Sequence, residues 1–492
     1  MYLFFSERIR EELNQIYKDR KKDIEQRMSK EIVYKDKYTN VQSIDEFKKS
    51  VEGTEFCFAG RLTKLRIFGK LIFATLSDIE GNLQISFESS KLNKEMFQKA
   101  KKELHTGDFI GVKGVIYFTK KMEKTISVNE FEILSVSIRE LPEKFHGVTN
   151  KEIMYRQRYL DLIANEESRK VFLKRLEILS EIRRYFSSNK FLEVETPILN
   201  MTSSGAAAKP FITHHNSLDK DLYLRIAPEL YLKQLMVGGF TKIFEIGKNF
   251  RNEGVDTTHL QEFTMIEWYA AYWDFNDNIE FSKELLCTVV RLVSDNLKVE
   301  YKSDIIDFNK WAELDYTSEM NRVLGIDILN VNSLEELQKH CLKFNIIDSS
   351  DINKAKSTAA LIDAIFKRKV RPYIIQPTIV YNYPRIMVPL ARINDEDERL
   401  IDMFQIIVCG MELVKSYSEL INPFQQIVAF EEQEENKKNG DEESMDIDWE
   451  FIKAMEYGMP PMSGAGLGID RLVALLLNKE SLRDVIFFPN VR

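Results

Sequence analysis

The segment from residue 250 to 269 carries side chains that could bind a nucleotide together with a charged small molecule. Arg251 and Glu253 come first, His259 follows, and an aromatic-rich run occupies residues 263–269. An arginine suits an anionic group, a flat ring suits a base, and a carboxylate suits an amine. Both flanks have strand character, which predicts that Arg251 and Glu253 share one face of a sheet. The same alternation predicts a shared face for Phe263, Met265, Glu267 and Tyr269. The alternative is an antiparallel hairpin whose arginine and glutamate pair for solubility.

The composition is that of a globular protein. A chain of 492 residues with 44% hydrophobic and 30% charged residues is expected to form roughly two to four domains. No apolar run approaches the length of a bilayer, and the first residues lack a basic leader, so we expect a cytoplasmic protein without a membrane segment. The cysteines lie far apart and are expected to be reduced thiols rather than zinc ligands: Cys57, Cys287, Cys341 and Cys409.

The charge is distributed unevenly along the chain. Residues 1–150 hold 27 Lys and Arg against 23 Asp and Glu, whereas the remaining 342 residues hold 42 against 54. A basic N-terminal part on an acidic body is expected for an appendage that reads nucleic acid. A chance imbalance of a few charges is the alternative.

The N-terminal third has the pattern of an oligonucleotide-binding barrel, the OB-fold. Residues 1–53 are predicted to be a helical extension, with helices over 6–29 and 44–50. Residues 54–142 then hold five short strands, with a helix after the third strand, which is the order expected of an OB-fold. The strands are expected at Glu55–Leu65, Leu71–Ser77, Leu83–Phe87, Phe109–Tyr117 and Thr125–Val136, and the helix at Asn93–Leu104.

Residues 143–165 are predicted to be a linker, and residues 166–492 form the larger domain. A long amphipathic helix is expected over 166–190, and further helices open at Ala227 or cover 277–296 and 333–345. Strands are expected at 192–198, 222–226, 241–246, 262–270, 374–380, 386–388, 403–409 and 411–419. Residues 431–443 are interpreted as an exposed loop or the start of a helix, and residues 464–471 as a glycine-rich turn before a final helix. The predicted fold class is α+β, with a mainly antiparallel sheet flanked by helices.

Three separated motifs in this order resemble the signatures of class II aminoacyl-tRNA synthetases. They are the strand from Phe191 to Pro197, the segment around Arg251, and the glycine-rich stretch that ends in Asp470 and Arg471. Three further stretches are similar to the class II lysyl-tRNA synthetase family in particular: Met154–Leu162, Gly205–Leu230 and Tyr417–Leu420. The resemblance extends from the barrel to the C-terminus. It implies ATP-dependent activation of L-lysine to lysyl-adenylate and transfer of the lysyl group to tRNA(Lys).

The resemblance implies a role for particular residues. Arg251, Glu253 and Arg471 would be the catalytic residues, because the reaction needs positioning and charge neutralisation rather than a covalent nucleophile. The residues expected to bind ATP are Arg251, Glu253, His259, Phe263, Glu412 and Arg471. The residues expected to bind lysine are Gly205, Glu229, Glu267, Tyr269, Tyr417, Glu419 and Gly466. An ε-ammonium has three donors and no acceptor, so carboxylates suit it.

The chain departs from the family pattern at four positions. Mg²⁺ is implied with ATP, and Glu412 matches a metal ligand, but Gln405 stands where a second acidic ligand is usual. Lys415 and Ser416 replace a common Asn-Gly pair beside the lysine pocket, where Lys415 should repel the substrate unless it points to the phosphates. Lys190 replaces the glycine of the first motif, which bears on packing.

In the barrel, Arg66, Phe73, Gln84 and Glu130 match positions that this family uses for a U-rich anticodon. Single-stranded bases stack on an aromatic ring and are read by hydrogen bonds to their edges; a core role is the alternative for Phe73. The resemblance also implies a homodimer. Two alternatives to a lysyl-tRNA synthetase stay open: another class II synthetase, for aspartate or asparagine, and a non-catalytic RNA-binding paralogue.

Overall fold

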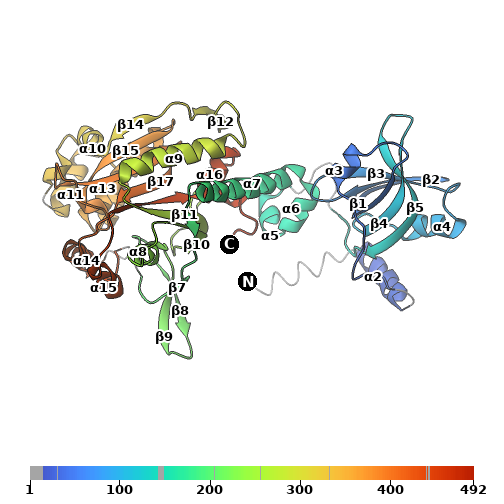
Figure 1. Ribbon diagram of the computed structural model, residues 1–492, viewed down its shortest axis with the longest axis horizontal. Helices are drawn as coiled ribbons and strands as arrows, with labels where there is room; N and C mark the ends of the chain where they lie inside the picture. The colour runs from blue at the N-terminus through green and yellow to red at the C-terminus, as the bar shows by residue number, and fades with distance from the viewer. Residues whose placement is uncertain are drawn as a thin grey trace. The chain divides into compact units, whose positions relative to one another are not determined.

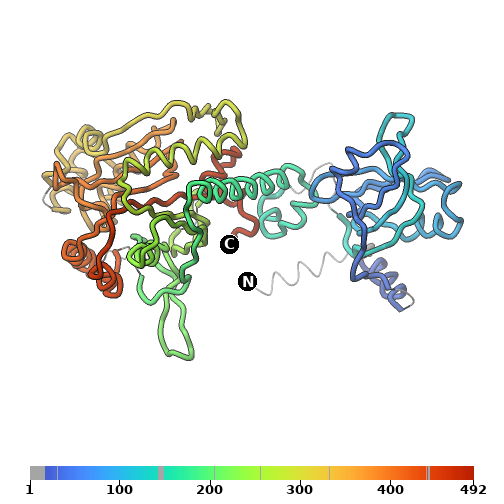
Figure 2. The backbone as a smooth tube through the Cα atoms, in the orientation of Figure 1, coloured from blue at the N-terminus to red at the C-terminus, as the bar shows by residue number. Residues whose placement is uncertain are grey.

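A computed structural model describes residues 15–29, 32–141, 149–203, 205–254, 256–331, 333–438, 440 and 444–491. The chain divides into two compact units, Met1–Arg169 and Lys170–Arg492. Figure 1 labels their elements, and Figure 2 traces the backbone of each. Among the helices in these ranges, none combines the length and the hydropathy that crossing a membrane requires.

The first unit contains a closed five-stranded barrel. Its strands follow the order β1-β2-β3-β5-β4, and α4 comes after the third strand, as predicted for an OB-fold. Alternate residues point inward and form one apolar core, which includes Ile72, Ile85 and Val112. The strands are β1 (Glu55–Phe68), β2 (Leu71–Ser77), β3 (Asn82–Glu88), β4 (Phe109–Phe118) and β5 (Lys124–Ser135).

Helices flank this barrel on both sides along the chain. The described part of the helix predicted over 6–29 is α2, and the residues before Gln15 lie outside the described residues. A reciprocal capping box between Ser43 and Glu46 starts α3. Two short helices, α5 and α6, occupy the described part of the predicted linker. The helices are α2 (Gln15–Met28), α3 (Ile44–Lys49), α4 (Lys94–Glu103), α5 (Lys151–Arg156) and α6 (Arg158–Ala164).

The second unit is built on an eight-stranded sheet. The strand order is β14-β15-β16-β17-β18-β11-β10-β6, antiparallel in the centre and parallel only at the two edges. This mainly antiparallel sheet agrees with the predicted α+β class. The strands are β6 (Leu192–Glu193), β10 (Lys242–Phe250), β11 (Glu262–Ala271), β14 (Ala312–Asp315), β15 (Thr378–Pro384), β16 (Leu400–Val408), β17 (Met411–Ser418) and β18 (Met462–Gly468).

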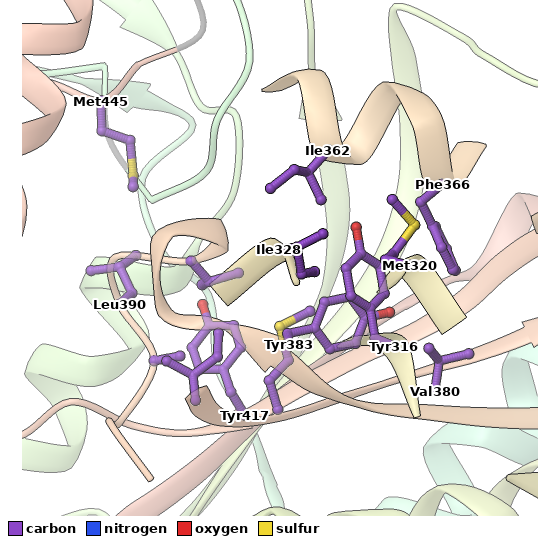
Figure 3. Packing of buried hydrophobic residues seen from close by; sticks show 14 of the residues in the cluster. Tyr316, Met320, Ile328, Ile362, Phe366, Val380, Tyr383, Leu390, Tyr417 and Met445 are labelled. Atoms are coloured by element: carbon purple, nitrogen blue, oxygen red, sulfur yellow. The ribbon is translucent and has the colours of Figure 1, made fainter. Parts of the chain in front are cut away.

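Each face of the sheet packs against its own set of helices. Apolar residues of α7 (Glu166–Ser188), α9 (Phe275–Val290) and α16 (Ile469–Leu476) cover one face. The opposite face shares a second core with the remaining helices, part of which is drawn in Figure 3. These are α8 (Glu229–Val237), α10 (Tyr316–Leu324), α11 (Leu334–Phe344), α12 (Ser349–Lys354), α13 (Thr358–Lys369), α14 (Pro423–Lys438) and α15 (Trp449–Glu456).

Smaller elements complete this unit. A three-stranded sheet has the order β7-β9-β8, and its β8–β9 hairpin protrudes from the body of the unit (Figure 2). The segment between α9 and α11 contains the β12–β13 hairpin as well as β14 and α10. The bounds are β7 (Leu199–Asn200), β8 (Phe211–His215), β9 (Lys220–Leu224), β12 (Lys298–Tyr301), β13 (Asp304–Asp307), η1 (Ile328–Asn330), η2 (Arg371–Tyr373), η3 (Arg385–Met387) and η4 (Leu482–Asp484).

Some local predictions were wrong. Residues 386–388 belong largely to the 3-10 helix η3, because the flanking Pro384 and Pro389 cannot donate to a strand ladder. The strand predicted over 192–198 is limited to β6, since Pro197 interrupts pairing at the sheet edge. Residues 431–438 are the second half of α14, and residues 439 and 441–443 lie outside the described residues.

The glycine-rich stretch near the C-terminus is a strand rather than a turn. β18 pairs with β11 on one edge and with β17 on the other, and α16 begins directly after it at Ile469. The glycines of this strand leave the backbone free to pair on both sides while removing side chains from the sheet surface. This combination opens the space in which the site lies.

Candidate active site

A pocket of about 440 Å³ lies on one face of the central sheet. Strand pairing places Glu267, Gly466, Lys415 and Gln405 in one row across four neighbouring strands. Tyr269, Gly464, Tyr417 and Met403 form the next row. Each row points the same way because residues two apart on a strand share a face. The prediction that Glu267 and Tyr269 share a face is therefore confirmed.

Two glycines make room between these side chains. A Cβ atom at Gly464 would overlap the ring of Tyr269 and Oε1 of Glu419. A Cβ atom at Gly466 would lie 2.8 Å from Cε of Met265. The floor of the pocket is thus bare backbone between acidic side chains on one side and Lys415 on the other.

One end of the pocket is a buried acidic cluster, which we define as Glu229, Glu267, Glu419 and Lys233, the lysine that pairs with Glu229 and Glu419. Nζ of Lys233 lies 2.6 Å from Oε1 of Glu229 and 2.5 Å from Oε2 of Glu419. The hydroxyl of Tyr417 donates to Oε1 of Glu229 at 2.6 Å, and that of Tyr269 donates to Oε1 of Glu267 at 2.7 Å. Three carboxylates therefore face a single buried cation.

The electrostatics of the acidic cluster reflect this imbalance. Burial raises the pKa of Glu267 to about 8, and the neighbouring charge of Glu229 adds to the effect. Burial also raises the pKa of Glu419 to about 8, although Lys233 opposes the shift. Oε1 of Glu419 has no hydrogen-bond partner among the described residues. With all three carboxylates ionised the cluster would carry two negative charges in excess, which bound protons or further cations would offset.

The other end of the pocket is cationic. Arg251 is half-buried, its guanidinium lies 5.1 Å from the ring centre of Phe263, and its Nε is buried without a partner among the described residues. Burial lowers the pKa of Arg251, with Arg471 adding to this effect while Glu253 opposes it. An orphaned buried donor next to a second arginine suits an anionic ligand.

The loop after β10 shows that the predicted common strand face of Arg251 and Glu253 was wrong. β10 ends at Phe250, so Arg251 and Glu253 lie in a loop and strand alternation does not place them on a common face. The backbone amide of Arg251 donates to the carbonyl of Gln261, and the backbone amide of Glu253 donates to the carbonyl of Arg251. These bonds turn the chain out of the sheet. Glu253 is exposed at the pocket rim. The β10–β11 hairpin itself is antiparallel, as expected.

His259 also belongs to this loop. Its Nδ1 lies 2.9 Å from Oδ2 of Asp256, and 41% of its side chain is exposed. The ring lines the pocket from above the cationic end.

Two buried ion pairs that position the site were missed from the sequence. Asp470 accepts from the amide of Thr264 at 2.8 Å and pairs with Arg175 of α7 at 2.6 Å, which ties α16 to β11. Arg471 then donates through Nη1 to the backbone carbonyl of Glu412 at 3.0 Å. The pairing of Lys233 with Glu229 has a sequence signal, a spacing of four residues on a helix, which could have identified it.

The site offers one protein ligand, the Glu412 carboxylate, to a magnesium–nucleotide complex. Glu412 lines the pocket, but Gln405 donates from Nε2 to Oε2 of Glu412 at 2.7 Å and accepts the hydroxyl of Tyr383 at 2.8 Å. Within the described ranges, no cluster of three or more His, Cys, Asp or Glu side chains could hold a metal. Mg²⁺ commonly takes one or two carboxylates plus phosphate oxygens, so Glu412 suffices while Gln405 offers a donor.

The pocket brings together most of the residues predicted for the site. Gly205, at a φ of +91°, lies beside Glu229, to whose Cβ an added Cβ would come within 3.6 Å. Glu419 does not line the pocket but lies directly behind its floor at Gly464. The predicted residues that line it are Gly205, Glu229, Arg251, Glu253, His259, Phe263, Glu267, Tyr269, Gln405, Glu412, Tyr417, Gly466 and Arg471.

The barrel places three of the four predicted anticodon residues on adjacent strands. Arg66 and Phe73 are direct cross-strand partners of β1 and β2, and Gln84 of β3 lies opposite Thr75. Phe73 is half-buried and lies outside the barrel core, while its neighbours Ile72 and Ala74 are buried. Glu130 lies elsewhere, exposed and opposite Lys113 of β4.

Comparison with known proteins defines the class. Residues 150–492 match the model of tRNA synthetases class II (D, K and N), and residues 56–134 match that of the OB-fold nucleic acid binding domain. The sheet, the pocket and these matches define a class II tRNA synthetase with an OB-fold domain.

The relatives narrow this class. A lysine–tRNA ligase of Aquifex aeolicus is 44% identical over 444 residues, 88% of this chain and 72% of the relative. Lysine–tRNA ligase 2 of Methanosarcina acetivorans is 43% identical over 449 residues, 91% of this chain and 87% of the relative. A lysine–tRNA ligase of Staphylococcus epidermidis is 42% identical over 451 residues, 92% and 90% of the two chains. The chain belongs to the lysine–tRNA ligase family of the class II synthetases.

Proposed function

We propose that this protein joins L-lysine to tRNA(Lys) in two steps. The lysine carboxylate attacks the α-phosphorus of ATP, which forms lysyl-adenylate and releases pyrophosphate. A terminal ribose hydroxyl of the tRNA then attacks the lysyl carbonyl and releases AMP. The observation that carries this proposal is the buried acidic cluster, in which three carboxylates face one lysine.

The acidic cluster favours an amino acid with a cationic end. An ε-ammonium beside Glu267 and the free Oε1 of Glu419 would supply the missing positive charge, and the hydroxyl of Tyr269 orients the nearer carboxylate. Gly205 and Glu229 would receive the α-ammonium group. An aspartate or asparagine substrate would bring a carboxylate or an amide to a cluster of carboxylates, where it could supply no positive charge.

The cationic end suits ATP. The fork of Arg251 can hold the lysine carboxylate and the α-phosphate together, which aligns the attacking oxygen with phosphorus. Arg471 and His259 lie where the outer phosphates would extend, and the ring of Phe263 offers a face to adenine. No side chain needs to form a covalent intermediate, so positioning and charge neutralisation carry the catalysis.

Mg²⁺ would be held by Glu412 together with phosphate oxygens. The ion, when bound, neutralises phosphate charge and so favours pyrophosphate as a leaving group. Gln405 holds the Glu412 carboxylate in a fixed orientation through its amide.

The outer face of the barrel supports anticodon binding. Phe73 projects beside Arg66, so a splayed base could stack on the ring while the arginine neutralises a phosphate. The amide of Gln84, which bonds to Thr125 at 2.9 Å, has polar atoms of the kind that read base edges. Glu130 would have to contact the RNA separately, because it does not pair with these three.

We also propose a cytoplasmic homodimer. Exposed apolar side chains gather on and after α7, in the region of the first motif: Leu173, Leu176, Leu192, Ile198 and Leu199. Burying these against a second copy would remove apolar surface from water.

The test is exchange of labelled pyrophosphate into ATP by the purified protein, assayed with each amino acid in turn. Exchange that depends on lysine is the expected result. Exchange with aspartate or asparagine would contradict the assignment of the acidic cluster. Retained tRNA binding without exchange for any amino acid would instead identify a non-catalytic paralogue.

A further inference from the structure

Lys415 is a cation on the floor of the active site whose charge the described residues leave uncompensated. It is half-buried in β17, lines the pocket, and lies between Gln405 of β16 and Gly466 of β18 in the register of the sheet. Across the described part of the chain, its ammonium makes no ion pair or hydrogen bond. The other pocket lysine, Lys367, is neutralised by Asp363 at 2.6 Å. A half-buried ammonium without a counterion indicates an anionic ligand.

The neighbour of Lys415 cannot supply that negative charge. Gln405 is neutral, and its orientation is determined by two partners, Tyr383 and Glu412. Because a carboxylate only accepts hydrogen bonds, the amide nitrogen must face Glu412 and the amide oxygen must face the tyrosine hydroxyl. Tyr383 is itself held in the core by stacking on Tyr316 at 4.3 Å (Figure 3). The amide oxygen therefore accepts from Tyr383, and the amide nitrogen rather than the oxygen faces Glu412, the expected metal ligand.

The same contacts reduce what Glu412 can offer to a metal. Its Oε2 accepts a hydrogen bond from Gln405, which occupies one of the lone pairs that the carboxylate could offer to a metal. To bind a second metal ion, the site would need another hard oxygen ligand here. Instead of such an oxygen, the sheet provides the ammonium group of Lys415, on the strand next to that of Gln405.

The register also decides which substrate Lys415 faces. Glu267 lies two strands away across Gly466, so its Cα and that of Lys415 are about 10 Å apart at the usual strand spacing. Lys415 is thus on the Gln405 side of the floor, in the same strand as the Glu412 carbonyl that accepts from Arg471, and two strands away from Glu267 of the acidic cluster. A cation beside the ε-ammonium would oppose lysine binding, whereas one beside the phosphates assists ATP.

We propose that Lys415 binds a phosphate oxygen of ATP and supplies positive charge that a second divalent cation would otherwise provide. The inference rests on the proposed function only in taking the ligand of the cationic end to be ATP. It makes nucleotide binding by this protein less dependent on Mg²⁺ than it would be with two carboxylates at positions 405 and 412.

Calorimetry with a non-hydrolysable ATP analogue, in EDTA and in excess Mg²⁺, tests the inference. In EDTA, Lys415→Gln should weaken binding about tenfold or more, the effect expected of one charge-assisted contact. The loss should be smaller in Mg²⁺. Lys367→Gln is the matched control, since it removes a pocket lysine that Asp363 already neutralises, and it should leave both affinities within about twofold.

Counting bound Mn²⁺ by electron paramagnetic resonance gives a second measurement. With the analogue present, the double variant Gln405→Glu, Lys415→Asn should bind more Mn²⁺ per site than the wild type and should lose affinity when metal is removed. An unchanged metal count in the double variant would overturn the inference. So would a Lys415→Gln variant that keeps its nucleotide affinity in EDTA and changes only its affinity for lysine. Neither measurement requires adenylate formation, so a failure here is distinct from a failure of pyrophosphate exchange.

Discussion

The ammonium group of Lys233 lies 2.5 Å from Oε2 of Glu419, and neither side chain has any surface exposed to solvent. Helix α8 supplies the lysine and the end of β17 leads into the glutamate, so the pair joins two elements distant in sequence. The lysine is shared with Glu229, so one cation faces three buried carboxylates. In the proposed function, the lysine substrate binds to a cluster that this structural cation cannot fully neutralise.

Removing this cation should destabilise the second unit. Lys233→Met leaves buried carboxylates without a partner, a change that typically costs about 3–5 kcal/mol. Chemical denaturation should show the loss, and adding Glu419→Gln to the variant should recover part of it. Lys367→Met, which removes an exposed pair, should cost less than about 1 kcal/mol. Equal losses for the two lysines would contradict the assigned role of Lys233.

Lysine binding should depend on pH. The pKa values of Glu267 and Glu419 are raised to about 8, so the empty site holds protons at neutral pH that the ε-ammonium must displace. The dissociation constant for lysine should therefore fall by up to about tenfold per unit from pH 6 to 8. Calorimetry in buffers of different ionisation enthalpy should detect proton release, and Glu267→Gln should reduce it.

The same pKa values predict the pH dependence of stability without ligand. The folded-state pKa of Glu267 lies above its unfolded value, so its contribution favours folding below about pH 4.5 and is lost as the pH rises towards 8. Bound lysine counteracts this loss. The rise in melting temperature caused by lysine should therefore be larger at pH 8 than at pH 6, and an equal rise would argue against the raised pKa.

Glu419→Gln should separate the two substrates. The change removes a negative charge next to the expected ε-ammonium position and should raise the KM for lysine about 30-fold or more, as expected for loss of a buried charge-pair partner. The KM for ATP should change little, because Arg251 and Arg471 lie at the opposite end of the pocket. The exposed Glu450 of α15 provides the control, Glu450→Gln. Equal effects on both substrates would show that Glu419 does not contact the ε-ammonium.

Lys190→Gly should stabilise the protein. Lys190 has a φ of +66° at the end of α7, in a Schellman motif closed by bonds from its own amide to Ser187 and from the amide of Phe191 to Phe186. Glycine adopts this conformation without strain, so the gain should be about 1 kcal/mol in unfolding free energy. Lys190→Ala, which keeps a Cβ atom, should show no comparable gain in the same denaturation experiment.

Phe73→Ala should weaken tRNA binding without unfolding the barrel. The ring lies outside the barrel core, and loss of one base-stacking platform costs about 1–3 kcal/mol. Filter binding of tRNA(Lys) should measure the change, with circular dichroism confirming that the fold is retained. Phe118→Ala removes an exposed ring from β4 instead and should leave the affinity unchanged.

Much of the fold could be predicted from local patterns. Strand alternation and the helix after the third strand were enough for the barrel, because each strand of a small barrel buries every second residue. The predicted bounds of strands and helices were wrong where pairing with segments distant in the sequence determines them. The glycine-rich stretch looked like a turn, but β11 and β17 on either side pair it into the sheet as β18.

The residue types predicted the chemistry of the site, but they did not predict its arrangement. The sequence alone determined that an arginine, an aromatic ring and several carboxylates occur in the order of a class II lysyl-tRNA synthetase. Only the tertiary structure decided that Lys233 pairs with Glu419, that Gln405 turns its donor towards Glu412, and that Lys415 finds no partner among the residues that the structure describes. The reason is that charge balance and hydrogen-bond direction depend on distances between strands and helices, which residue identity does not specify.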